Sequence, residues 1–250
     1  MTDIYNNRTY LLNNPTWHEE DSFYKAKKIS ELLKKSALTF QTVCEVGCGT
    51  GEILVQLSLQ FPSIKKFTGF DISNDVFPIA KAKQTDKVCF KLEDITNVNE
   101  TFDLILVIDV IEHLENYFLF LDAISTKSKY TVFHIPLDMC MWSLFREQML
   151  IESKNRIGHI HNFTEDFITN ILEERGYRII DKLYTEPSFK NISTKQTVIN
   201  NLRKLLFRIN KRFCMKTLGG YSVMLLTQNT KWNNYERKTG LEPATFSLGN

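Results

Sequence analysis

The chain has 250 residues, of which 43% are hydrophobic and 24% are charged, and its formal net charge is +2. This composition is ordinary for a soluble globular protein with one sizeable core, and so small a charge gives no reason to expect a nucleic-acid partner. No apolar run approaches the roughly twenty residues that a membrane span needs, and the N-terminus lacks the pattern of a signal peptide. We therefore expect a cytoplasmic protein, in which the five cysteines, odd in number and without metal-ligand spacing, are reduced.

The first 21 residues are polar and irregular, and a helical pattern begins directly after them. Apolar residues recur at helical spacing from Phe23 to Leu33. Either Asp21 or Ser22 could cap this helix, because both residue types accept hydrogen bonds from the unpaired N–H groups of a first helical turn.

Three of the ten glycines, Gly47, Gly49 and Gly51, fall between a β-branched run and a second helical pattern. The stretch from Val43 to Leu54 reads VCEVGCGTGEIL, which indicates a strand, a tight turn and a helix. Glycine suits such a turn because it adopts positive φ and places no Cβ between the backbone and a ligand. The following helix start offers further N–H groups, so the turn is predicted to touch a small molecule.

From Gln41 to Pro136, short apolar runs alternate with helical patterns, which is typical of a parallel sheet covered by helices on both faces. The run LILVI is apolar without alternation, as expected of a central strand buried on both faces. Strands are predicted near residues 42–46, 66–71, 87–92, 102–109 and 130–135. Helices are predicted near residues 51–61, 74–84 and 113–125.

Residues 137–158 form a Met- and aromatic-rich segment where the fold needs only a short connection. An insert at this point would lie over the carboxyl ends of the strands, where open α/β sheets bind ligands, and would face the substrate. Alternatively, the segment is an amphipathic helix packed on the sheet edge.

The C-terminal part supplies one more helix, two strands and a second insert. The helix is predicted to start at Thr164 and to end at Gly176, and strands are predicted at Tyr177–Leu183 and Tyr221–Thr227. Residues 229–250 lack periodicity and are expected to be a disordered tail. The sequence pattern changes abruptly at these residues, which would also be expected if they were translated by read-through beyond the natural end of a gene.

The second insert, residues 190–216, is basic and has no acidic residue. Its apolar residues recur at helical spacing, at Val198, Leu202, Leu205, Ile209 and Phe213. Such a helix could pack on the domain with a solvated basic face. Residues 195–216 could instead contact an anionic membrane surface or a phosphate-bearing substrate.

The motifs after the glycine turn resemble those of one family. Asp71 ends the second strand, Asp94 and Ile95 follow in KLEDIT, and the fourth strand leads into FDLILVIDVIEHL. In order and spacing, the sequence resembles the class I S-adenosylmethionine-dependent methyltransferases over roughly Lys25 to Gln228.

The resemblance implies a fold and a domain organisation. The fold is a Rossmann-like α/β sheet of seven mostly parallel strands with helices on both faces, in which the last strand lies antiparallel between the fifth and sixth. The methyltransferase domain would span residues 22–228, with inserts near 137–158 and 190–216. Segment 1–21 would be a lid over the cofactor mouth, unless it is only a surface segment leading into the first helix.

The resemblance also implies cofactor contacts. The loop from Glu45 to Gly51 would wrap the methionine part of S-adenosylmethionine, Asp71 would bind the ribose, Asp94 and Ile95 would border the adenine, and Asp109 would lie beneath the sulfonium. The predicted cofactor-binding residues are Glu45, Gly47, Cys48, Gly49, Thr50, Gly51, Asp71, Ile72, Asp94, Ile95 and Asp109.

The histidines are the candidate general bases, because a hydroxyl acceptor must lose a proton and imidazole titrates near working pH. The predicted catalytic residues are His113, which follows the fourth strand, and His161; His113 could instead only shape the cofactor pocket. His134 is expected to be a core or pocket residue. His159 and His161 could serve a metal, but no third ligand stands at a suitable spacing, so no metal site is predicted.

We therefore expect a methyltransferase that acts on a small-molecule, sugar or lipid-linked acceptor, at oxygen. One alternative is a non-catalytic interaction subunit with the same fold, against which the intact cofactor residues argue. A nicotinamide-dependent oxidoreductase is disfavoured, because its G-x-G-x-x-G turn needs a third glycine where Glu52 stands.

Overall fold

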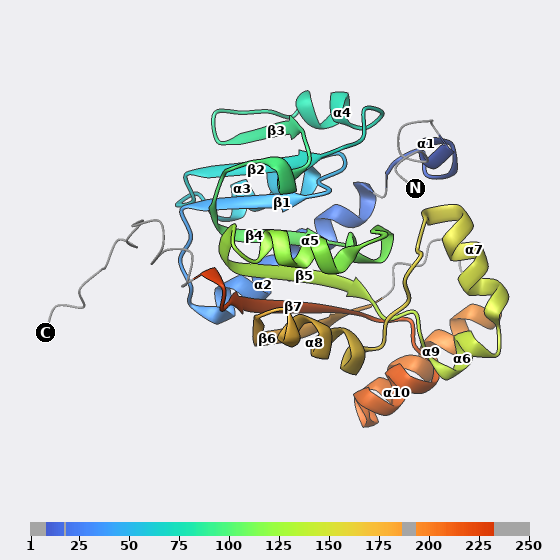
Figure 1. The fold of residues 1–250 in the computed structure, drawn as a ribbon. Helices are drawn as coiled ribbons and strands as arrows, with labels where there is room; N and C mark the ends of the chain where they lie inside the picture. The colour runs from blue at the N-terminus through green and yellow to red at the C-terminus, as the bar shows by residue number, and fades with distance from the viewer. Residues whose placement is uncertain (1–8, 18, 187–193, 233–250) are drawn as a thin grey trace, which may run out of the picture.

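The computed structural model describes residues 9–17, 19–186 and 194–232. Its strands form one sheet in the order β3-β2-β1-β4-β5-β7-β6 (Figure 1). The strands are β1 (Thr42–Val46), β2 (Lys66–Asp71), β3 (Val88–Leu92), β4 (Phe102–Ile108), β5 (Ser128–Pro136), β6 (Tyr177–Thr185) and β7 (Ser222–Asn229). The helices are α1 (Thr9–Asn13), α2 (Glu19–Ser36), α3 (Glu52–Gln60), α4 (Phe77–Lys81), α5 (Tyr117–Ile124), α6 (Met141–Leu144), α7 (Glu147–Ile157), α8 (Glu165–Glu174), α9 (Thr194–Ile209) and α10 (Lys211–Thr217).

The sheet has the predicted topology. The pairs formed among β1 to β5 are parallel, and β7 pairs antiparallel with both β5 and β6. The prediction that the last strand lies between the fifth and sixth is confirmed. Because β1, β2, β4 and β5 run in the same direction, their carboxyl ends meet at one edge of the sheet (Figure 1).

The central strand β4 is buried on both faces. Leu104 and Leu106 pack into a cluster with residues of α2 and α3, whereas Ile105 and Val107 pack into a second cluster with residues of α5 and α8. All four side chains are completely buried. Successive side chains of β4 point to opposite faces of the sheet, and each face is covered by its own core. Every position in this run is therefore apolar, and the sequence shows no alternation of apolar and polar residues.

Three predicted helix starts are wrong, and one of them is that of α4, which begins at Phe77 instead of residue 74. Helix α2 begins at Glu19, so Asp21 and Ser22 lie within its first turns rather than at the cap. The acidic first turn still suits the positive end of the helix dipole. Helix α5 begins at Tyr117 instead of residue 113, because Asn116 caps it by accepting a hydrogen bond from the Leu119 N–H. The residues before it form a short 3-10 helix, Ile111–His113.

The basic insert forms two helices, and the predicted apolar stripe does not face the protein. Asn210 separates α9 from α10 and caps α10 with its side chain. On α9 the buried side chain is Arg203, only 8% exposed, while Leu205 and Ile209 are 56% and 72% exposed. Arg203 donates to the carbonyl of Leu218. The predicted stripe is therefore exposed, whereas Phe207 of the same helix packs inward, with its ring stacked on Tyr221.

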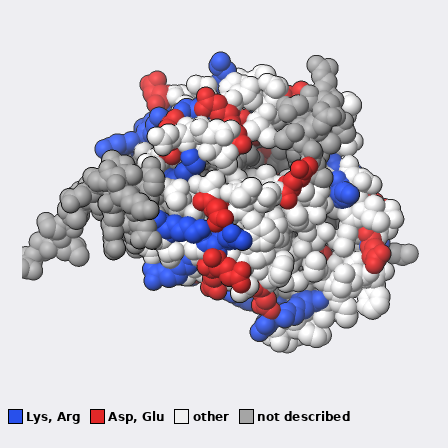
Figure 2. All heavy atoms as spheres, in the orientation of Figure 1, with Lys and Arg blue, Asp and Glu red and all other residues white. Residues whose placement is uncertain are grey.

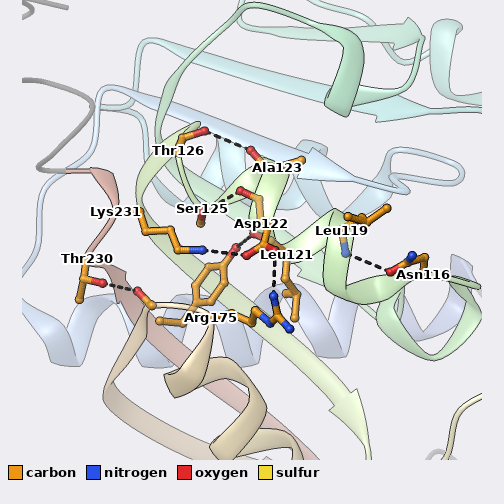
Figure 3. Close-up of polar contacts among 12 residues, drawn as sticks. Asn116, Leu119, Leu121, Asp122, Ala123, Ser125, Thr126, Arg175, Thr230 and Lys231 are labelled. Atoms are coloured by element: carbon orange, nitrogen blue, oxygen red, sulfur yellow. Dashed lines mark hydrogen bonds and ion pairs between the residues drawn. The ribbon is translucent and has the colours of Figure 1, made fainter. Parts of the chain in front are cut away.

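Residues 229–232 belong to the fold, although they were assigned to the tail. Lys231 and Arg175 both bind the Asp122 carboxylate, at 2.7 and 2.9 Å (Figure 3). This contact fastens the chain after β7 to the end of α5. The rest of the predicted tail, 233–250, lies outside the described residues.

Within the part of the chain that the structure describes, no helix is both long and apolar enough to cross a membrane. Acidic and basic side chains are interspersed on the face shown in Figure 2, where the described residues form no broad patch of one sign.

Candidate functional site

The glycine turn links β1 to α3, and its three glycines all adopt left-handed backbone angles. The φ values are 64° at Gly47, 53° at Gly49 and 76° at Gly51. A Cβ added at Gly51 would lie 2.3 Å from the Phe90 ring, whereas a Cβ at Gly49 would meet no described heavy atom within 4 Å. Gly51 is therefore required by the packing inside the protein, while Gly49 faces open space beside the turn.

Asp71, at the carboxyl end of β2, holds the turn in place. Its Oδ2 accepts a hydrogen bond from the Gly49 N–H and its Oδ1 accepts one from the Ser73 N–H, both at 2.8 Å. Burial raises the pKa of Asp71, and these N–H groups partly oppose the shift. Each carboxylate oxygen can accept a second hydrogen bond, so Asp71 can still receive hydroxyl donors from a ligand.

Glu45, on β1, is 2% exposed, and no described group donates to its Oε2. Burial raises the pKa of Glu45 well above its ordinary value. A buried acceptor without a donor costs free energy, and an amino or hydroxyl donor of a ligand would remove that cost. With the open space at Gly49 and the spare acceptor sites of Asp71, Glu45 fits a ligand that carries both amino and hydroxyl groups, as S-adenosylmethionine does.

The other predicted cofactor residues lie in or beside the same edge. Cys48 and Thr50 are buried within the turn. Ile72 follows β2 and is 44% exposed, while Ile95 is buried. Asp94 follows β3 and caps a short 3-10 helix by accepting hydrogen bonds from the Thr96 N–H and hydroxyl.

Asp109, at the carboxyl end of β4, forms an ion-pair network that the sequence did not predict. Its Oδ1 lies 2.5 Å from His134 Nδ1 and its Oδ2 lies 2.6 Å from Lys25 Nζ, which comes from α2. Burial opposes ionisation, but His134 and Lys25 outweigh it and lower the pKa of Asp109. His134 is buried with both ring nitrogens paired, since its Nε2 also bonds the Thr185 hydroxyl at 2.7 Å. Asp109 adopts φ 53°, a left-handed angle that is rare outside glycine.

Glu112 is a further buried carboxyl at this edge, three residues beyond Asp109. Its side chain is completely buried, and neither of its oxygens accepts a hydrogen bond from a described residue. Burial and the charge of Asp109 raise the pKa of Glu112 well above its ordinary value. The Glu112 carbonyl accepts the N–H groups of Ile160 and His161, which ties the histidine segment to the end of β4.

His113 and His159 adjoin Glu112, with ring centroids 4.9 Å apart. His113 Nδ1 lies 3.1 Å from the Gly158 carbonyl, and His159 Nδ1 lies 2.9 Å from Asp138 Oδ2. The ligating atoms of Glu112, His113 and His159 all lie within 4.8 Å of one another. This group differs from the pair His159 and His161 considered in the sequence analysis, because it contains Glu112 and His113 in place of His161.

His161, the other predicted catalytic residue, is turned toward the protein. Its Nε2 lies 2.8 Å from the Leu114 carbonyl, and its ring packs edge-to-face on Tyr117. It does not belong to the group of ligating atoms formed by Glu112, His113 and His159. Of the two predicted bases, His113 is therefore the one next to a buried, unpartnered carboxyl.

The N-terminal segment and the first insert meet at this edge of the sheet. Helices α1 and α7 are in contact (Figure 1), and Asn14 donates to the Arg156 carbonyl at 3.2 Å. Burial raises the pKa of Tyr10 to about 12. The charge of Lys25 opposes this shift and the charge of Asp109 adds to it. The segment predicted to be a lid and the first insert are thus in contact with each other.

Comparisons with known proteins agree with this geometry. The model of a family described as a methyltransferase domain matches residues 17–182. Pavine N-methyltransferase from Thalictrum flavum subsp. glaucum is 33% identical over 92 residues, which cover 34% of this chain and 26% of that protein. A probable (S)-tetrahydroprotoberberine N-methyltransferase from Papaver bracteatum is 29% identical over 119 residues, 44% of this chain and 33% of that protein. The chain thus spans a quarter to a third of the length of these relatives.

Solved structures share the fold. Magnesium protoporphyrin IX methyltransferase from Synechocystis, crystallised with S-adenosylhomocysteine, matches with a TM-score of 0.56 and 16% identity over 83% of each chain. A methyltransferase structure from Bacillus halodurans matches with a TM-score of 0.59 and 16% identity over 81% of this chain and 99% of that one.

Proposed function

The chain belongs to the class I S-adenosylmethionine-dependent methyltransferase family, and from that premise we propose that it methylates a small-molecule acceptor. The observation that carries the proposal is the glycine turn, where open space at Gly49 adjoins the unpartnered Glu45 oxygen and the spare acceptor sites of Asp71. Family membership disfavours the nicotinamide-dependent alternative. The intact site argues against a non-catalytic interaction subunit.

When bound, the cofactor supplies a methyl group on a positively charged sulfur, an electrophile that needs no covalent help from the protein. Glu45 and Asp71 bind and orient, because their carboxyl oxygens accept hydrogen bonds from amino and hydroxyl groups. Lys25 and His134 hold Asp109 rigid at the end of β4. The main contribution of these residues is positioning, which can supply several kcal/mol of a reaction barrier.

We propose oxygen as the accepting atom and His113 as the general base. A hydroxyl must lose a proton, and a neutral imidazole can take it. Since the Gly158 carbonyl can only accept, His113 Nδ1 carries the hydrogen, which places the lone pair of the neutral ring on Nε2. His161 is the weaker candidate, because its ring packs edge-to-face on Tyr117 and lies outside the group formed by Glu112, His113 and His159.

Nitrogen is the second candidate, supported by the names of the two N-methyltransferases that match part of the chain. A neutral amine needs no base to attack a methyl group. The two candidates differ in how they respond to His113→Gln, which should slow transfer to hydroxyl acceptors far more than transfer to amines.

The experiment is an assay of S-adenosylhomocysteine release with matched hydroxyl and amine acceptors drawn from small molecules, sugars and lipid-linked intermediates. Product mass would identify the methylated atom class. Turnover with hydroxyl acceptors that falls in His113→Gln while cofactor affinity is unchanged supports the proposal. Turnover confined to amines contradicts the choice of oxygen.

We also propose that α9 contacts an anionic membrane surface, which would suit a lipid-linked acceptor. Its outer face combines apolar side chains with Lys204 and Arg208. Helix α10, which packs on α9, adds the exposed Phe213. Exposed apolar residues rimmed by basic ones are typical of interfacial helices.

A further inference from the structure

We infer that Glu112, His113 and His159 form a binding site for a first-row divalent metal ion at the carboxyl end of β4. Two imidazoles and one carboxylate are ligands that Zn²⁺, Mn²⁺, Fe²⁺ and Co²⁺ accept. The three ligating atoms lie within 4.8 Å of one another. Three protein ligands leave coordination positions open for water or an acceptor.

The state of Glu112 points to a cation. The side chain is completely buried, and no described residue donates a hydrogen bond to either oxygen. Buried carboxyls are ordinarily paired, hydrogen-bonded or bound to a metal. The nearest basic atom described for it is His159 Nε2, at 4.0 Å from Oε1, which is beyond hydrogen-bond distance but suits two ligands of one ion.

Both histidines are oriented as metal ligands are. His159 Nδ1 bonds Asp138 and His113 Nδ1 bonds the Gly158 carbonyl, so each ring carries its hydrogen on Nδ1 and its lone pair on Nε2. Metal-ligating histidines commonly donate their other N–H to a carboxylate or a backbone carbonyl in this way. In His159, that assignment places the lone pair on the nitrogen that lies 4.0 Å from Glu112 Oε1.

The spacing needs only a small adjustment. With metal–ligand bonds of about 2.1 Å, tetrahedral ligand atoms lie about 3.4 Å apart. The Glu112–His159 pair, at 4.0 Å, would close by about 0.6 Å, and no pair of the three lies more than 4.8 Å apart, so none needs to close by more than about 1.4 Å. The backbone is already fixed, because the Glu112 carbonyl accepts two N–H groups of the segment that carries His159.

A metal here would polarise an acceptor hydroxyl and lower its pKa; this role rests on the proposed oxygen transfer, whereas the binding of the ion does not. His113 would then ligate the ion, and an ion-bound hydroxyl would need no imidazole base. The test therefore measures metal binding directly, without turnover, so that its failure leaves methyl transfer untouched.

The experiment is calorimetric titration of the chelator-treated full chain with Zn²⁺ and, separately, Mn²⁺. We expect one ion per chain, bound at least tenfold more weakly in Glu112→Gln and in His159→Ala. The matched control is Glu45→Gln, which replaces the other buried carboxyl with an unpartnered oxygen. That variant should keep the wild-type metal affinity.

If Glu112→Gln or His159→Ala fails to fold, a substitution outside the core still tests the inference. Asp138→Asn changes a half-buried partner of His159 and should weaken metal binding by about tenfold to a hundredfold. No ion bound by the wild-type chain overturns the inference. Wild-type affinity in Glu112→Gln overturns it as well, since the ion would then lie elsewhere, for example on the cysteine thiols.

Discussion

The glycine turn allows stability and cofactor binding to be separated by two matched substitutions, Gly49→Ala and Gly51→Ala. Both place a Cβ at a left-handed position, which costs an L-residue about 1–2 kcal/mol. Only Gly51→Ala also meets a buried side chain, since its Cβ would lie 2.3 Å from the Phe90 ring. That ring cannot easily retreat, because a Cβ at Gly69 would lie 2.6 Å from it on another side.

The expected magnitudes follow from this difference. Overpacking a core costs about 1–3 kcal/mol, so Gly51→Ala should be less stable than Gly49→Ala by about that amount. For a chain of this size, 1 kcal/mol shifts the melting temperature by about 2–4 °C. Gly51→Ala should therefore melt roughly 2–12 °C below Gly49→Ala.

For cofactor affinity we expect the opposite order, with Gly49→Ala more affected than Gly51→Ala. In Gly49→Ala the new methyl group enters the space proposed for the cofactor, and we expect at least tenfold weaker binding, about 1.4 kcal/mol. Thermal unfolding and calorimetric titration with S-adenosylmethionine measure the two effects on the same samples. Wild-type affinity in a folded Gly49→Ala would refute the assignment of this open space to the cofactor.

Three other predictions concern separate parts of the molecule. Asp71→Ala should weaken S-adenosylmethionine binding by about 1.5–3 kcal/mol, as expected for hydrogen bonds to a charged group, and unchanged affinity in calorimetry would exclude Asp71 as a ribose ligand. Hydrogen bonding from Lys231 lowers the pKa of Asp122, so its stabilising contribution is present above the unfolded value near pH 4 and is lost at lower pH. Asp122→Asn should therefore melt below wild type at pH 7, and a difference that stayed constant down to pH 2 would contradict this pairing. If α9 contacts membranes, sedimentation with phosphatidylserine vesicles should fall in Leu205→Glu but not in the exposed control Leu59→Glu on α3, and equal sedimentation would argue against the contact.

Local patterns predicted the parts of the fold that depend on neighbouring residues. The strand bounds of β1 and β2 agree with the structure, because a β-branched run ends at Gly47 and a run of aromatic and small residues ends at Asp71. The glycine turn followed from the spacing of three residues. The place of β7 between β5 and β6 came from the family resemblance, since no local pattern encodes which strands pair.

The contacts that were missed join segments far apart in the chain. Lys25 reaches Asp109 across 84 positions, and His159 approaches Glu112 only because two backbone N–H groups fix its segment to the end of β4. Sequence spacing cannot reveal such a pair. The sequence did contain a signal for Glu112. This acidic residue stands directly before His113 in an apolar context, and burying a carboxylate costs free energy unless it is paired or bound to a metal.

Periodicity also failed to show which face of α9 is buried. It correctly indicated an amphipathic helix, but the predicted stripe is exposed, and Phe207, which packs on the core cluster, lies outside that stripe. Arg203 shares the inner face with Phe207 and donates one hydrogen bond to the Leu218 carbonyl and another to the Asn200 side-chain oxygen. The direction of a helix face depends on the polar groups of the surface beneath it, which the sequence of the helix does not contain.

The most direct test of the account is parallel calorimetric titration of the wild-type chain with S-adenosylmethionine, S-adenosylhomocysteine and NADH. We predict micromolar binding of the first two, reduced in Glu45→Gln, and no binding of NADH. Absence of binding by both sulfur compounds would contradict the assignment of the glycine turn as a working cofactor site and would favour a non-catalytic interaction subunit.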